Sequence, residues 1–328
     1  MSHGRSMITV VLLVPTVIAL ALWAFLWPNA RLAPRDLPLG VAGPGQATAP
    51  VKTELEQYDG AFEVHPYADE AAARTAIERR EIYGAVVVTQ QGPQLLTASA
   101  ASPAVAQLLT DAIGEQGGRP MPTKDVVALP EEDPRGTALN ASVLPMTLAG
   151  IAMGGVVTVL GLRGTRAATA VLGTASAIGL VAAGIAHSWL GALTGDWWAE
   201  AGAFALVALA GGATVTGLAA LLGTGGIGLG ALLLMLLGNP FSGVSTAPEL
   251  LPEPAATLGQ WLPPGAGGQL LRSASYFDGN AVGGPLVTLG IWGLLGLSLI
   301  WLGALIKRRH ATGGHDSVAE VRPAASPV

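Results

Sequence analysis

The 328-residue chain contains no cysteine and few charged residues. Without cysteine it has no disulfide, no thiolate metal site and no cysteine nucleophile. Only 12% of its residues are charged, whereas 51% are apolar; soluble domains carry about 25% charged residues. This balance excludes a soluble enzyme or a nucleic-acid-binding protein as the whole chain, and it indicates an integral membrane protein. The excess of Arg over Lys, with much Ala, Gly and Pro, is typical of GC-rich bacterial coding.

Familiar catalytic and cofactor motifs are also absent. None of the three lysines follows a glycine, so the chain has no P-loop of its own for ATP. It also lacks G-x-S-x-G and H-E-x-x-H. We therefore expect no enzyme activity, no catalytic residues, no cofactor and no bound metal.

The apolar residues are concentrated in stretches long enough to cross a bilayer, which takes about 20 residues per helix. The first stretch, residues 7–27, is longer than the apolar core of a signal peptide and ends in aromatic residues, so we expect a retained anchor. Residues 143–306 carry only eight charges, all between apolar stretches. Five further spans are predicted there, at Val143–Leu162, Ala167–Trp189, Ala201–Leu222, the short Ile227–Leu237, and Ala281–Ile306.

Basic residues predict the orientation of these six spans. One side holds seven of them, and the short connections on the other side hold only Arg272. We therefore expect a multi-pass protein of the cell membrane, with a cytoplasmic N-terminus (1–6) and a disordered cytoplasmic tail (307–328). None of the predicted spans contains Asp, Glu, Lys or Arg, which argues against an ion-coupled transporter. His187 is interpreted as interfacial packing, and the Asp196–Glu200 cluster as a helix cap at the interface rather than a cation site.

Residues 28–142 are predicted to form an extracytoplasmic α/β domain between the first two spans. Strands are expected at Leu37–Ala42, Phe62–His65, Gly84–Val88 and Gln94–Thr97, with a return to the sheet at Val126–Leu129. Helices are expected around Val51 and Leu55, after the cap Asp69, and after Ser102-Pro103. Nine basic and fifteen acidic residues make the domain acidic overall, and Arg79-Arg80-Glu81 is interpreted as a solvated helix face.

The proline-rich segment 239–280 is the most unusual part of the chain. It is polar but rich in large apolar residues, and short helices are expected at Leu251–Trp261 and Gly268–Ser275. Such pieces would lie on the membrane or dip into it. We therefore expect an outer lid over an exit path, with these candidate residues: Pro240, Leu251, Pro252, Trp261, Pro263 and Arg272.

Small residues within the spans indicate close helix packing. Gly150 and Gly154 form one Gly-x-x-x-Gly pair, and Gly226 and Gly230 form another. Such pairs serve equally for packing within one chain or at a dimer seam, and the sequence leaves both open.

The order of these parts resembles the type-2 ABC exporter permease family and its phage-infection-protein-like membrane relatives. The resemblance rests on two stretches of the α/β domain, the strand Pro38–Ala42 and "YGAVVV" at Tyr83–Val88. It also rests on three elements of the outer loop: Leu251-Pro252, Trp261-Leu262-Pro263 and Leu271-Arg272. The resemblance implies an exporter subunit that works as a homo- or heterodimer in membrane lipid with a separate ABC ATPase, and without nucleic acid.

One feature departs from that family. Its members carry a cytoplasmic coupling segment between the second and third spans, where this chain has only the loop from Arg163 to Arg166. An alternative therefore stays open: a non-transporting membrane-anchored surface, receptor or regulatory protein that acts through its extracytoplasmic domain.

Overall fold

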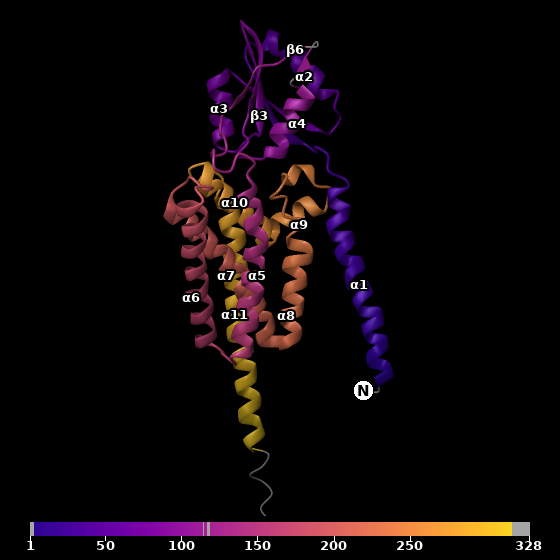
Figure 1. The fold of residues 1–328 in the computed structure, drawn as a ribbon, viewed down its shortest axis with the longest axis vertical. Coiled ribbons are helices and arrows are strands. Elements are labelled where there is room, and N and C mark those ends of the chain that lie inside the picture. The colour runs from indigo at the N-terminus through magenta and orange to yellow at the C-terminus, as the bar shows by residue number, and fades with distance from the viewer. Residues whose placement is uncertain (1–2, 114, 117–118, 317–328) are drawn as a thin grey trace, which may run out of the picture.

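The computed structural model describes residues 3–113, 115–116 and 119–316. The described chain is mostly helical, and five of its helices are long and apolar enough to cross a membrane (Figure 1). The chain thus has the composition and helix lengths of a multi-pass membrane protein. An α/β domain lies at one end of the helical bundle, which we call the domain-side end; the opposite end is the far end.

The bundle is built around α7 (Trp197–Leu222). Packed against it are α5 (Thr137–Val159), α6 (Thr165–Ala183) with its π-helical extension η1 (Gly184–Trp189), and α11 (Gly283–Asp316). α7 consists largely of Ala and Gly, so its neighbours approach closely and most of it is buried.

The segment expected to be a short span lies at the limit for crossing. α8 (Thr224–Ala231) continues directly into the π-helix η2 (Leu232–Gly238). Together they rise about 22 Å, which is less than the roughly 30 Å of a bilayer core. They nevertheless run from the turn after α7 at the far end back to α9 at the domain-side end (Figure 1).

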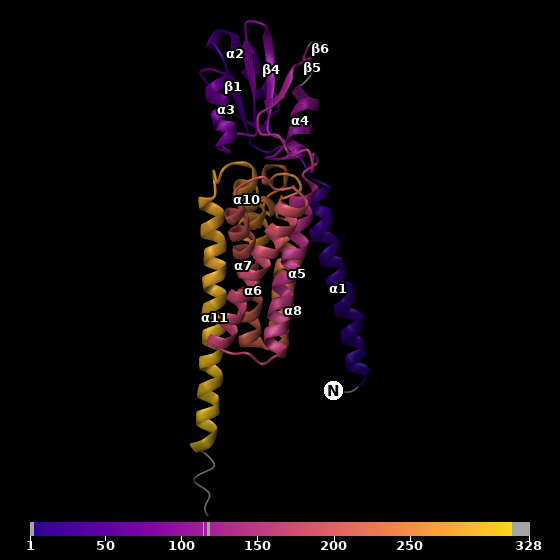
Figure 2. The same cartoon turned by 60° about the vertical axis from the view of Figure 1, so that its left-hand side comes forward.

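The first helix, α1 (His3–Asn29), stands apart from the bundle (Figures 1 and 2). Only 6% of the 18-residue apolar stretch that could cross a membrane is buried against the rest of the chain. It contacts the bundle near its end, where Trp23 and Trp27 stack on each other and meet the ring of Phe241 edge-on. Ala24 is fully buried beside them.

The α/β domain contains a five-stranded sheet in the order β2-β1-β3-β4-β7. β1 pairs in parallel with β2 and β3, β3 and β4 form an antiparallel hairpin, and β7 pairs in parallel with β4. The bounds are β1 (Leu37–Ala42), β2 (Phe62–Tyr67), β3 (Gly84–Thr89), β4 (Gly92–Thr97) and β7 (Thr123–Asp125), with a separate small ladder of β5 (Glu115–Gln116) and β6 (Arg119–Pro120). The return to the sheet was thus expected a few residues too late, because β7 ends before Val126.

Helices cover both faces of this sheet, as the continuous apolar strand β3 predicts. α2 (Gly45–Glu56) and α4 (Pro103–Ile113) pack on one face, and α3 (Glu70–Glu78) on the other. The predicted caps are present: Asp69 accepts a hydrogen bond from the backbone N–H of Ala72, and Ser102 accepts one from that of Val105.

The C-terminal end differs from the expectation of a disordered tail. α11 continues without a break past the far end of the bundle to Asp316 (Figure 1), so residues 307–316 are helical. The rest of the predicted tail, 317–328, lies outside the described residues.

The four glycines predicted for helix packing lie at contacts between helices of the same chain. A Cβ on Gly150 would reach the backbone of Gly211 at 3.0 Å, and one on Gly154 would meet Val215 at 2.4 Å. Gly226 faces the carbonyl of Leu218, and Gly230 faces Val215. These pairs bring α5 and α8 close to α7.

The adjacent glycines of α8 provide a matched test of this packing. A Cβ on Gly226 would lie 2.2 Å from the Leu218 oxygen, whereas one on Gly225 meets nothing within 4 Å. Gly226→Ala should lower the free energy of unfolding by about 1–3 kcal/mol, because the backbone of α7 must move. Gly225→Ala should leave stability unchanged or raise it by up to about 1 kcal/mol. Thermal unfolding of the purified protein in detergent measures both, and equal effects would contradict this packing.

Candidate functional site: the joint between the α/β domain and the bundle

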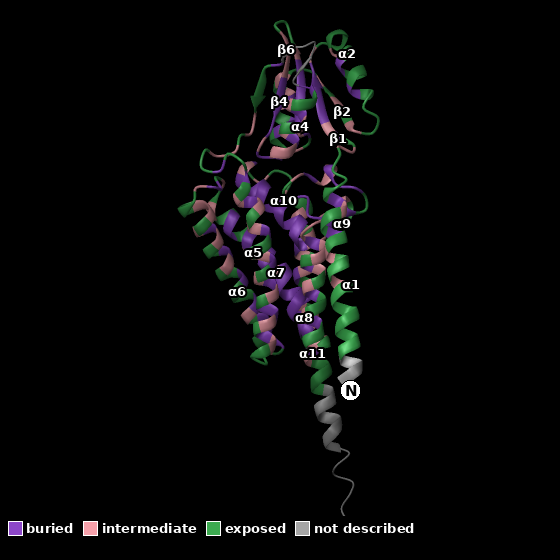
Figure 3. Cartoon of the chain, turned by 45° about the vertical axis from the view of Figure 1, so that its right-hand side comes forward, coloured by how far each residue is buried: buried purple, intermediate pink, exposed green. Residues whose placement is uncertain are grey.

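The segment expected to be a lid is built into the bundle. After the 3-10 turn η3 (Pro248–Leu250) it forms α9 (Ala255–Trp261) and α10 (Pro263–Tyr276). α10 packs against α5, α7 and α11, and most of its residues are buried (Figure 3). Of the candidate lid residues, Leu251, Pro252, Pro263 and Arg272 are buried, Pro240 is half-buried, and only Trp261 is exposed. The segment therefore packs into the domain-side end of the bundle and does not lie across its surface; we call residues 239–280 the wedge.

The wedge also completes the core of the α/β domain. Ala247 and Leu250 pack into the cluster formed by β1, α2 and α4. Phe277 packs into the cluster on the other face of the sheet, beside Ile77 of α3. Side chains of this segment therefore belong to the hydrophobic core of the α/β domain. The domain is packed against the bundle and is not joined to it by a loose linker.

Polar contacts reinforce this joint, and Arg80 makes three of them. It follows α3, and its guanidinium donates to the backbone oxygen of Gln269 (3.2 Å), to the Ser273 hydroxyl (2.6 Å) and to the Gln269 side chain. It also lies 5.3 Å from the centre of the Phe277 ring. Arg80 thus ties the domain to α10.

A second polar pair joins Tyr83, the residue before strand β3, to the turn before α9. The Tyr83 hydroxyl donates to the Glu249 carboxylate at 2.7 Å. Burial, and then the charge of Glu249, raise the pKa of Tyr83 far above its usual range, so the hydroxyl keeps its proton. Nearby, the backbone N–H and the guanidinium of Arg35 donate to the carbonyls of Glu249 and Leu250, and Ser102 donates to the carbonyl of Thr246.

Arg272 lies beneath these groups, only 3% exposed. Its guanidinium donates to the carbonyl of Val244 at 2.7 Å. Burial, followed by the nearby Arg80 charge, lowers the pKa of Arg272 to about 10. It therefore remains a buried cation at neutral pH.

A cleft of about 650 Å³ opens at this joint. Its residues come mainly from the turn between α3 and β3, from the wedge, and from the first turns of α11. The volume falls within the roughly 300–1,000 Å³ typical of small-molecule sites. The joint and its cleft are the strongest candidate site in the described part of the chain.

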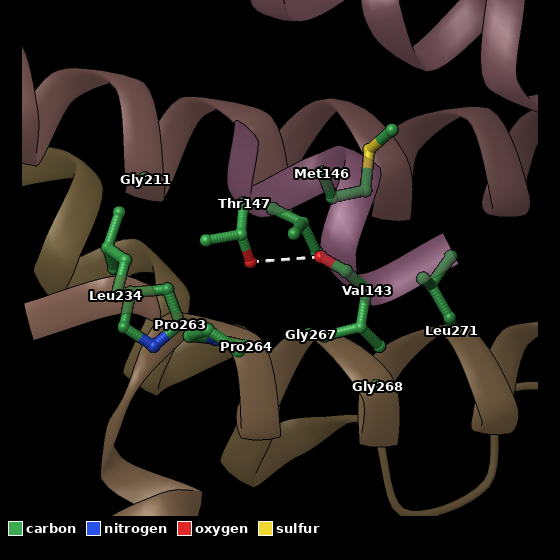
Figure 4. Close-up of a pocket in the computed structure, with 11 residues that line it drawn as sticks. Val143, Met146, Thr147, Gly211, Leu234, Pro263, Pro264, Gly267, Gly268 and Leu271 are labelled. Carbon is green, nitrogen blue, oxygen red and sulfur yellow. Dashed lines mark hydrogen bonds between the residues drawn. The ribbon is translucent and has the colours of Figure 1, made fainter. Parts of the chain in front are cut away.

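The cavity beneath α10 is much smaller. The cavity shown in Figure 4 lies between α5, α7 and α10 and measures about 20 Å³. It is lined by apolar groups such as Val143 and Leu271, together with Thr147, whose hydroxyl is already bonded to the backbone oxygen of Val143. That volume holds about one water, so this cavity is no substrate path.

One acidic residue lies in the first turn of a helix long and apolar enough to cross a membrane, because this helix begins four residues earlier than expected. α7 begins at Trp197 because Asp196 caps it, accepting from the N–H of Ala199. Glu200 is therefore in the first turn of the helix and is 0% exposed. Its carboxylate pairs with His187 Nδ1 at 2.9 Å and accepts from the N–H of Gly195 at 2.9 Å. These contacts give both residues a structural role in holding the end of η1 against α7.

The two arginines of the predicted loop lie at the far end of the bundle and are exposed. Arg163 lines two cavities, of about 220 and 150 Å³, and Lys307 lines both of them too. Arg308 lines the larger one. The far end therefore presents a basic surface.

Sequence reasoning missed Arg80 as a site residue. Its position after α3 suggested a solvated face, but its backbone has a φ of 61°. This turns the side chain out of the helical pattern and toward α10. The only sequence signal was a non-glycine residue where a helix end favours glycine.

Comparisons with known proteins found no match among protein-family models, curated proteins or solved structures. Among the described residues, no group of three or more His, Asp or Glu side chains is placed to hold a metal ion.

Proposed function

We propose that the chain is the membrane-embedded, permease-like subunit of an exporter that works with a separate ATPase in the plasma membrane. In this proposal the α/β domain is extracytoplasmic and both termini are cytoplasmic. The observation that carries the proposal is the wedge: its helix α10 packs against the bundle helices, and its residues Ala247, Leu250 and Phe277 complete the core of the α/β domain. A shift of α10 relative to α7 would therefore be transmitted to the domain.

The cavities favour a paired arrangement. The space beneath α10 holds about one water, so a substrate would leave along the surface of the bundle, between two copies or between this chain and a similar one. α1 leaves an apolar surface for lipid or for such a partner, since nearly all of it is exposed.

The ATPase would dock at the basic far end, around Arg163 and Arg166. We expect a tagged chain, solubilised from its native membrane, to retain an ATPase and to hydrolyse ATP. Replacing Arg163 and Arg166 by glutamate should greatly reduce the recovered ATPase activity, whereas the same change at Arg74, a partly exposed residue on α3 of the domain, should not. A chain recovered with no ATPase would contradict the proposal.

The short connection between α5 and α6 favours a second candidate, a membrane-anchored recognition or regulatory protein without transport. It offers little docking surface, because only residues 160–164 separate the two helices. On this alternative, replacing Arg163 and Arg166 would leave the cellular function intact, whereas substitutions on the exposed face of the domain would abolish it.

A further inference from the structure

Basic side chains meet at the far end of the bundle, where the turn between α5 and α6 approaches α11. Arg163, Lys307 and Arg308 line the cavity of about 220 Å³ there, and Arg163 and Lys307 also line the neighbouring one of about 150 Å³. Among the described residues, no carboxylate lines either cavity, and neither Arg163 nor Lys307 forms an ion pair. The described side chains of the larger cavity therefore carry three positive charges and no negative one.

Packing of the turn against α11 brings these charges together. Gly164 is buried and has a left-handed backbone, with φ at 55°. A Cβ added to it would meet the Cβ of Ala304 at 3.5 Å, and Figure 2 shows this turn beside α11. Ala304 is only three residues before Lys307 on the same helix. The backbone next to Arg163 is therefore held against α11, so that Arg163 and Lys307 border one space.

The same cavity has an apolar side. Trp301 and Leu305 line it, and they are 47% and 52% exposed. Trp301, Leu305 and Arg308 are spaced i, i+4 and i+7, so they share one face of α11. The apolar span of this helix ends at Arg308, and Trp301 lies about 9 Å before Lys307 along its axis. In a membrane the basic groups would therefore lie at the level of the lipid phosphates, with Trp301 at the adjoining interface.

The volume of this cavity suits a headgroup. At about 220 Å³ it is smaller than the roughly 300–1,000 Å³ of sites that enclose a whole small molecule. A lipid headgroup can occupy it while the acyl chains lie outside, along Trp301 and Leu305. Basic pockets between membrane helices hold the heads of anionic lipids in this way.

We propose that the far end binds an anionic phospholipid, with its phosphate among Arg163, Lys307 and Arg308 and an acyl chain along Trp301 and Leu305. The three cations supply charge-assisted hydrogen bonds to the phosphate oxygens. The site requires no ATPase, so it stands whether or not the proposed export activity does.

Lipid titration of the purified full-length protein in detergent, read by native mass spectrometry, tests the charged side of the site. The probes are phosphatidylglycerol and phosphatidylcholine with the same acyl chains. One basic residue near an anionic lipid contributes about fivefold in affinity, so three of them should give at least about a tenfold preference for phosphatidylglycerol. Arg163→Gln should lower this preference about fivefold. The matched control is Arg166→Gln, because Arg166 is an exposed arginine close by that lines neither cavity, and it should leave the preference unchanged.

Leu305→Ala tests the apolar side without changing a charge. It should weaken the binding of both lipids by about three- to fivefold and leave their ratio unchanged, because the acyl chain loses part of its contact. Leu302→Ala is the control, since Leu302 is 46% exposed on the same helix but lines neither cavity. It should bind both lipids as the unaltered protein does.

Glycerol 1-phosphate, which is the head without a tail, separates a lipid site from a site for free phosphate esters. It should not compete at lipid concentrations. Equal affinity for the two lipids, or equal effects of Arg163→Gln and Arg166→Gln, would overturn the proposed site. Full binding by Leu305→Ala, or competition by glycerol 1-phosphate, would overturn it as a site for a lipid.

Discussion

Gly259→Ala is expected to cause the largest loss of stability of any glycine-to-alanine change among the described glycines. A Cβ at position 259 of α9 would lie 1.6 Å from the carbonyl oxygen of Phe241. Neither atom is at the end of a flexible side chain, so the backbone of the wedge must move. Overpacking costs about 1–3 kcal/mol where side chains can adjust; here we expect about 3 kcal/mol or more.

The consequence should extend to the first helix. Phe241 is the ring against which Trp23 and Trp27 pack, so displacing it weakens the contact of α1 with the bundle, which then depends on η2. We expect a lower unfolding temperature in detergent and a change in tryptophan fluorescence. Gly202→Ala is the control, because Gly202 lies on the exposed side of α7 and a Cβ added there would meet nothing within 4 Å. If Gly259→Ala and Gly202→Ala unfold at the same temperature, the wedge is not packed as described.

Much of the fold could be predicted because it depends on local pattern. The apolar runs predict the long helices, since a bilayer sets their length. In the α/β domain, the bounds of β1 were predicted correctly at Leu37–Ala42, and Asp69 and Ser102 were identified as caps from their residue types. These signals lie within a few residues of the structure that they determine.

The joint could not be predicted because its contacts link distant parts of the chain. Arg80 and Gln269 are 189 residues apart, and Tyr83 and Glu249 are 166 apart. Each side chain looks like a surface residue in its own segment. The buried Glu200 was missed for a related reason: its partner His187 belongs to the preceding helix, and the helix start was placed four residues too late.

Sidedness of the membrane is the claim on which the proposed function depends most. In the proposed arrangement, the α/β domain and the wedge lie outside the cell, and the α5–α6 and α7–α8 turns lie inside. Because the chain has no cysteine, single cysteines can be introduced without interference. Exposed positions are available on both sides: Gln90 in the turn between β3 and β4, Ser245 in the wedge, Thr165 at the start of α6, and Thr224 at the start of α8.

Labelling of these four single-cysteine variants with a membrane-impermeant thiol reagent tests that arrangement most directly. We expect positions 90 and 245 to react in intact cells, whereas positions 165 and 224 should react only after lysis. Thr224 and Ser245 lie on either side of the short α8–η2 segment, so this pair also tests whether that segment crosses the membrane. Reaction of position 165 or 224 in intact cells, or protection of position 245 until lysis, would contradict the six-crossing arrangement.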